Sequence, residues 1–179
     1  MTVVLSLLEK LGSLHSAGFR ILESIPAVRA AQARLGLDST SRQWRRLEPL
    51  RAALIAAVPE SSFHLIALDS GRQKSSFDLH QSNIQIRDAM LLLRPYVTSV
   101  DAAAFFDRYK VPATEQASAR QALQFAHAAA ARTAGQSPAA DSEAAVSRSS
   151  TLTEETTELL QIARWWPAAV TEASSIGTP

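Results

Sequence analysis

The sequence contains no cysteine, which excludes disulfide bonds, thiolate metal sites and cysteine nucleophiles. Among its 179 residues it has only 6 glycines, and no apolar run approaches the ~20 residues that cross a bilayer. The net charge of +1 gives no overall attraction to nucleic acid. Residues 1–11 lack a basic region before their apolar stretch, which argues against a secretory signal. We therefore expect a cytoplasmic globular protein, with association with a membrane as the alternative.

The sequence also lacks the short motifs that mark common catalytic sites. It has no glycine-rich phosphate loop and no G-x-S-x-G nucleophile elbow. Its four histidines are widely separated and show no metal-ligand spacing: His15, His64, His80 and His127. We therefore expect no metal and no cofactor, name no catalytic residue, and favour a non-enzymatic role over an enzymatic one.

Abundant alanine and apolar residues three and four positions apart predict an all-α protein, an irregular bundle of about six helices. The first predicted helix is the cleanest, with apolar residues on one face from Val4 to Ile25, and it ends before Pro26. We interpret it as a core helix, with a dimerising helix and a membrane-surface helix as alternatives. A short second helix is predicted over residues 26–34.

A third helix is predicted over residues 41–58, with N-cap oxygens at Asp38 to Ser41 and a kink or break near Arg45 caused by Pro49. Residues 59–75 are predicted to form a packed loop. The strongest helical pattern follows and stops at Pro95. Its apolar face is expected to hold Leu79, Asn83, Ile86, Met90, Leu93 and Val97, extended by Leu91 and Leu92.

The spacing of Thr98 and Asp101 is that of a capping box, which predicts a helix start there. After Pro112, an alanine-rich helix is predicted to end near Gly135. Residues 136–150 are rich in alanine, serine, glycine and proline without an apolar period, a composition typical of a flexible linker.

Thr151 and Glu154 predict the start of a last helix, residues 151–170. We expect one of the adjacent tryptophans Trp165 and Trp166 to lie in an interface or to half-cover a neighbouring element. The residues expected to share its inward face are Leu152, Leu159, Ala163 and Trp166. The predicted organisation is a helical core domain over residues 1–135, a linker over 136–150, and a C-terminal helix that packs back on the core.

Arginine is concentrated in the first third of the chain, and the group Arg42, Trp44, Arg45 and Arg46 is a candidate basic surface. Such a group could contact anionic lipid head groups or nucleic acid. A solvated helix face is the favoured interpretation, because no set of aromatic side chains accompanies the arginines as a stacking platform.

A second group of charged residues lies in or beside the strongest helical pattern, where Arg87 and Arg94 are seven residues apart. Charges this close to a core face are usually paired, because an unpaired buried charge is costly. A fold-specifying salt bridge is the favoured interpretation, and an interhelical ion-pair latch or an anion-binding spot is the functional alternative. With Asp88 and Tyr96, these two arginines are the candidate binding residues.

Two segments carry a family resemblance: RRLEPLRAALIAAVPE at residues 45–60 and IQIRDAMLLLRPYV at residues 84–97. The first matches the pattern L-x-P-L-W-x-A-L-x-x-A-x-P-E, except that Arg51 replaces the tryptophan. The second matches R-R-V-I-E-I-R-D-G-x-x-x-L-R-P-Y at Ile84, Ile86, Arg87, Asp88, Leu93, Arg94, Pro95 and Tyr96. Both resemble an actinobacterial family of putative transporters, in which a multi-pass membrane region precedes a cytosolic helical domain of unknown function.

The resemblance covers residues 42 to 170 and implies that this chain is similar to the cytosolic domain of that family. Gln81, Ser82 and Gln85 replace the arginine pair and the glutamate of the family pattern, and Ala89 replaces the glycine. The membrane region has no counterpart in this sequence. The resemblance therefore implies either a free-standing relative or a domain whose partner supplies the membrane part.

These observations favour a non-enzymatic interaction or regulatory module that binds a protein partner or a second copy of itself. One alternative is a small-molecule or lipid binder whose apolar pocket is floored by Arg87 and Arg94. Another is binding to a membrane surface or to nucleic acid through the basic stretch from Arg42 to Arg51, although nucleic acid is not the expected partner.

Overall fold

The computed structural model describes residues 38–61, 75–138 and 151–176. Within these residues the chain forms five α-helices and no strand, which confirms the predicted all-α class. The helices are α2 (Ser39–Ala57), α3 (Ser76–Leu93), α4 (Ala103–Tyr109), α5 (Gln116–Thr133) and α6 (Leu152–Ile176), with 3-10 turns at η1 (Pro59–Ser61), η2 (Arg94–Tyr96) and η3 (Ala113–Glu115). The helices predicted before residue 38, most of the loop over 59–75 and most of the linker over 136–150 lie outside the described residues.

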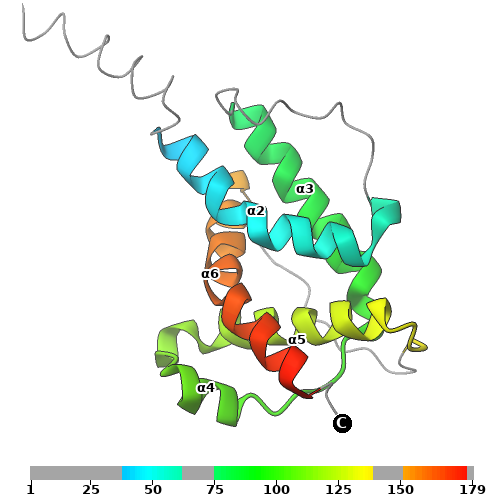
Figure 1. Cartoon of the computed structure of the whole chain (residues 1–179). Helices are drawn as coiled ribbons and strands as arrows, with labels where there is room; N and C mark the ends of the chain where they lie inside the picture. Colours follow the sequence, from blue (N-terminus) through cyan, green and yellow to red (C-terminus); the bar gives the residue numbers. More distant parts are fainter. Residues whose placement is uncertain (1–37, 62–74, 139–150, 177–179) are drawn as a thin grey trace, which may run out of the picture.

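Helix α2 begins where the sequence predicts. Oδ2 of Asp38 accepts a hydrogen bond of 3.1 Å from the backbone N–H of Ser41, and the hydrogen bonding of Ser41 lowers the pKa of the Asp38 carboxyl. The helix continues through Pro49, which is expected to cause a kink or a break near Arg45, and Figure 1 shows it changing direction along its length without a break. Its inward residues are Leu47, Leu50 and Leu54.

Helix α3 begins at a capping box that the sequence analysis missed. The Ser75 hydroxyl accepts from the N–H of Asp78, and the Asp78 carboxylate accepts from the N–H of Ser75. The predicted inward residues from Leu79 to Leu93 are buried, but the extension to Leu91 and Leu92 is wrong, because both are exposed. Leu91 lies five residues after Ile86, about 140° round the helix, so it is on the opposite side from the core.

The short helix α4 corrects the predicted capping box at Thr98. The helix begins at Ala103, and the Asp101 carboxylate accepts a hydrogen bond of 3.0 Å from the N–H of that residue. Asp101 itself therefore supplies the oxygen at the helix start, and Thr98 precedes the first turn. The end of α5 near Gly135 is confirmed, because this glycine adopts the left-handed φ of 70° that often follows a helix.

Helix α6 begins at the predicted cap, where Thr151 and Glu154 exchange two hydrogen bonds of 3.2 Å. It is longer than expected and continues through Pro167 to Ile176. Trp166 is buried, whereas Trp165 is half-buried and its indole N–H donates to Glu115, as expected for one of the pair. Leu152 does not face inward, because this first residue of the helix lies at the edge of the bundle and is exposed.

The five helices pack around one apolar core. Helix α6 packs against α5 and also contacts α2 and α3, while α2 crosses α3 (Figure 1). The largest fully buried apolar side chains come from all five helices: Leu47, Leu50, Leu54, Ile86, Leu93, Phe105, Leu123, Leu159 and Ile162. The core therefore holds α3 between α2 on one flank and α6 on another.

Candidate interaction surface

Helix α3 is apolar on two opposite sides. Its inward side contributes Ile86, Ala89, Met90 and Leu93 to the core, as described above. Three large apolar residues on the other side are exposed: Phe77 (64%), Ile84 (44%) and Leu91 (61%). We refer to these three residues as the α3 stripe.

The residues of the α3 stripe form one row along the helix. They are spaced by seven residues, which is two helical turns less about 20°, so their side chains project in nearly the same direction. Single exposed apolar residues are ordinary on a protein surface. Three large ones on the same side of a helix, two turns apart, have the spacing of the apolar anchors by which a helix recognises a partner. The stripe is therefore the strongest candidate for a binding surface among the described residues.

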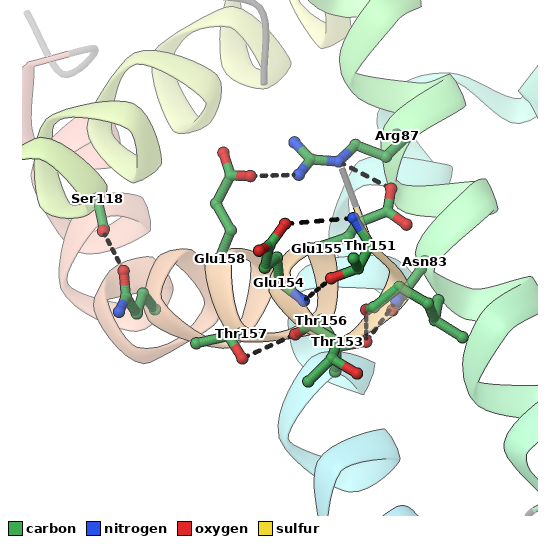
Figure 2. A network of polar contacts seen from close by, with 12 residues as sticks. Asn83, Arg87, Ser118, Thr151, Thr153, Glu154, Glu155, Thr156, Thr157 and Glu158 are labelled. Carbon is green, nitrogen blue, oxygen red and sulfur yellow. Dashed lines mark hydrogen bonds and ion pairs between the residues drawn. The ribbon is translucent and has the colours of Figure 1, made fainter. Parts of the chain in front are cut away.

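One edge of α3 is attached to α6 by polar contacts, which Figure 2 shows. The Arg87 guanidinium donates to Glu155 Oε1 at 3.3 Å and to Glu158 Oε2 at 2.7 Å. One turn earlier, the buried amide of Asn83 donates to the hydroxyl of Thr156 at 2.8 Å. These contacts fix α3 against the first turns of α6.

The other edge of α3 is attached to α2. Nη1 of Arg51 donates to Oε1 of Gln85 at 3.0 Å, and the same guanidinium forms an ion pair with Glu48 within α2. Because both flanks of α3 have polar anchors and its inward side lies in the core, the α3 stripe sits on a fixed helix. A fixed helix binds a partner with little loss of conformational entropy.

The four candidate binding residues lie on α3 and η2. Arg87 faces α6 and forms salt bridges with Glu155 and Glu158, and a salt bridge is the favoured interpretation of this residue in the sequence. Tyr96 lies in η2, where the guanidinium of Arg132 stands 5.4 Å from its ring centre. Asp88 is half-buried and Arg94 is exposed. A binding role for these residues remains a prediction.

The candidate basic surface lies on the first half of α2. Arg42, Arg45 and Arg46 are exposed, whereas Trp44 is half-buried and packs against the core. The tryptophan therefore serves the packing of α2. Contact of this surface with lipid or nucleic acid remains a prediction.

A separate groove lies between α2, α5 and α6. Its volume is about 510 Å³, and its walls are almost entirely apolar. The lining residues are Ala53, Ala56, Ala57, Ala126, Ala129, Ala130, Thr133, Ala134, Trp166, Val170, Ala173 and Ser174. We refer to it as the alanine groove. Neither Arg87 nor Arg94 lines it, so it differs from the pocket that the sequence analysis proposed.

The described residues contain neither a metal-binding group of side chains nor a helix that could span a membrane. No group of three or more histidine, aspartate or glutamate side chains there could hold a metal ion. None of the helices that the structure describes combines the length and the apolar character needed to cross a bilayer. Of the four histidines considered above, His15 and His64 lie outside the described ranges.

The sequence analysis named Arg87 but missed the feature beside it. It assigned Leu91 to the core and passed over Phe77 and Ile84. The signal was present, because the seven-residue spacing of these three residues can be read from the sequence. The sequence analysis treated the two apolar rows of α3 as one wide buried face. Only the packing of α2 and α6 against α3 shows which row is buried and which is exposed.

Comparison with known proteins gives one result that bears on identity. No curated protein and no solved structure matches the chain. A family model does match, over residues 36–169, which is about three quarters of the chain and nearly the range of the resemblance described above. The transporter context and the source implied by that resemblance are not part of this match. The chain belongs to this family, which is described as a family of unknown function, DUF6545.

Proposed function

We propose that this chain is a non-catalytic interaction module that binds a protein through the α3 stripe. The observation that carries this proposal is the row of Phe77, Ile84 and Leu91 on the outward side of a helix whose inward side is already in the core. Complete burial of a side chain of this size is worth about 1.5–3 kcal/mol relative to exposure. A partner that covers the row gains part of that energy at each of the three positions.

The anchoring of α3 supports the same proposal. The Arg87 ion pairs and the Arg51–Gln85 hydrogen bond lie on opposite flanks of the helix and leave its outward side open. An exposed apolar row on a fixed helix is suited to helix-in-groove or helix-on-helix recognition, where anchor side chains recur at intervals of three, four or seven residues.

The resemblance to the actinobacterial transporter family supports a more specific form of this proposal. In that form the module works in the cytoplasm, beside a membrane, and regulates a partner. The partner is either a protein that contains the membrane region or a second copy of the chain.

Affinity purification from the cells that produce the protein tests the proposal. The tagged wild-type chain is compared with Leu91→Asp, which places a charge in the α3 stripe, and with Val170→Asp, which places one on α6. Val170 is 40% exposed and lies fourteen residues after Thr156, about 21 Å further along the helix. We expect a protein partner that Leu91→Asp loses and Val170→Asp retains. A set of retained proteins that is identical for all three chains contradicts the proposal.

A second candidate function is the binding of an apolar small molecule or lipid chain in the alanine groove. The volume of about 510 Å³ lies within the usual range of ligand sites, and Trp166 offers an apolar wall. Native mass spectrometry of the purified chain tests this candidate. A retained mass that disappears on denaturation supports it, and a bare chain at every mild condition contradicts it.

A further inference from the structure

We propose that two copies of the chain associate through their α3 helices, which run antiparallel about a twofold axis at Ile84. This inference deepens the proposed function and rests on it, because it names a second copy as the partner of the α3 stripe. It is carried by the self-complementary register of the stripe and by the polar residues along its two edges.

The α3 stripe is symmetric in sequence about its central residue. Phe77 lies seven residues before Ile84, and Leu91 lies seven residues after it. In an antiparallel pair with twofold symmetry, each residue lies opposite the residue that is equally far on the other side of the axis. Ile84 therefore meets Ile84 of the second copy, and Phe77 meets Leu91 at both ends. Each layer of the α3 stripe of one copy thus receives a layer of the stripe of the other.

The first polar edge of the stripe matches itself in the same arrangement. Gln81 lies three residues before Ile84 and Asp88 lies four residues after it. Both are on the same side of Ile84, about 60° and about 40° from it around the helix axis. An antiparallel pair brings the Gln81 amide of each copy beside the Asp88 carboxylate of the other. The amide N–H can donate to the carboxylate, and the match occurs twice because of the symmetry.

The second edge contains His80 and Arg87, four residues before and three residues after Ile84 on the opposite side. The same operation brings His80 of one copy beside Arg87 of the other and toward Glu155 and Glu158, which bind that guanidinium. The imidazole N–H can donate to the oxygens of these carboxylates that Arg87 leaves open. The first edge therefore pairs donors with acceptors directly, and the second does so through the carboxylates of α6.

A parallel pair loses these matches. It sets Phe77 against Phe77 and Leu91 against Leu91, and it places the Gln81 edge of one copy beside the His80 edge of the other. It also aligns the two helix dipoles, whereas the antiparallel pair opposes them. The antiparallel orientation is therefore the one that the residues favour.

The mass of the full chain in solution is the first test. Light scattering is expected to give twice 19.3 kDa, falling toward a single mass on dilution. Ile84→Asp is expected to give a monomer at every concentration, because the symmetry brings two carboxylates together at the axis. Thr171→Asp, at an exposed position on α6 outside the lining of the alanine groove, is expected to keep the dimer. Circular dichroism of both variants confirms that each is folded.

Single cysteines test the orientation, since the chain has none of its own. With a short bis-maleimide linker, Ile84→Cys is expected to cross-link to itself. Phe77→Cys and Leu91→Cys are each expected to remain uncrosslinked alone, because two equivalent positions lie fourteen residues apart, about 21 Å, in the antiparallel pair. A mixture of these two variants is expected to cross-link.

Three results overturn the inference: a monomeric wild-type chain across the micromolar range, a dimer that Ile84→Asp leaves intact, or a Phe77→Cys chain that cross-links to itself. A monomeric chain that still loses a different protein partner on Leu91→Asp overturns only the dimer and leaves the proposed function standing. A monomeric chain whose retained proteins do not depend on the α3 stripe overturns both.

Discussion

The side chain of Asn83 on α3 donates a hydrogen bond of 2.8 Å to the hydroxyl of Thr156 on α6, and both residues are buried. The same hydroxyl donates at 2.8 Å to the carbonyl of Leu152, one turn earlier in α6. This chain of two hydrogen bonds joins the start of the last helix to the middle of α3. Together with the Arg87 ion pairs, it keeps α3 in place while its outward side remains exposed (Figure 2).

Substitutions at Asn83 and Thr156 are expected to be strongly non-additive. Thr156→Val leaves the buried Asn83 amide without this acceptor, and we expect a loss of about 1–3 kcal/mol of unfolding free energy. Asn83→Leu costs less, because the Thr156 hydroxyl keeps its bond to Leu152. In the Asn83→Leu background, Thr156→Val is expected to be nearly neutral. Urea denaturation of the wild type, the two single variants and the double variant measures the coupling between the two positions. Losses of unfolding free energy that simply add in the double variant would contradict the expectation.

The ion pairs of Arg87 are expected to stabilise the fold more than those of Arg108. The Arg87 side chain is 18% exposed and faces two carboxylates, whereas Arg108 is 58% exposed and faces Glu172 alone. We expect Arg87→Met to cost about 1 kcal/mol and Arg108→Met to cost less than about 0.5 kcal/mol. Denaturation at low and high salt measures the loss of unfolding free energy in each variant. The loss in Arg87→Met is expected to be smaller at high salt, because salt screens the ion pairs. Equal costs for the two variants count against this assignment.

His127 on α5 is expected to make stability depend on pH. Burial lowers the pKa of His127 below its ordinary value of 6.5, and the charge of Glu172 opposes that shift. The unfolded chain therefore binds the proton first, so the contribution of neutral His127 is complete above pH 6.5 and declines as the pH falls toward the lower folded-state pKa. The stability of wild type relative to His127→Gln is expected to decrease between pH 7 and pH 5. Denaturation curves that stay parallel over this range contradict the expectation.

Filling the alanine groove is expected to remove any apolar ligand without unfolding the chain. Ala56 and Ala130 line the groove from opposite helices and are exposed, so larger side chains there extend into the groove rather than into the core. We expect Ala56→Leu with Ala130→Leu to weaken binding of a fluorescent fatty-acid probe at least tenfold while circular dichroism stays unchanged. The control is Leu91→Asp, which lies outside the groove. Equal probe binding by the filled and the wild-type chain places the ligand elsewhere.

Local signals in the sequence predicted the helix ends best. Asp38 and the pair Thr151 and Glu154 act as predicted, because a cap depends only on residues three or four positions apart. The capping box at Thr98 failed for the same local reason. Asp101 can either complete a box with Thr98 or accept a hydrogen bond from the N–H of Ala103, the first helical residue, and the spacing alone does not distinguish the two.

The seven-residue spacing of the outer row of α3 can be read from the sequence, but which apolar residues of α3 are exposed could not be predicted from local pattern. Leu91 and Leu93 are equally apolar in the sequence, and only the position of α2 and α6 makes one of them exposed and the other buried. The partners of Arg87 were missed for a related reason. Glu155 and Glu158 lie about seventy residues later, and no periodicity connects two helices so far apart in sequence.

Site-specific photo-crosslinking in the cells that produce the protein tests the central claim most directly, namely that a protein covers the α3 stripe. A photoreactive phenylalanine analogue replaces Phe77 in one chain and Val170 in a second chain, and the adducts of each are compared. The account predicts a discrete protein adduct from position 77 and none of the same mass from position 170. Adducts that are absent at position 77, or identical at both positions, would contradict it.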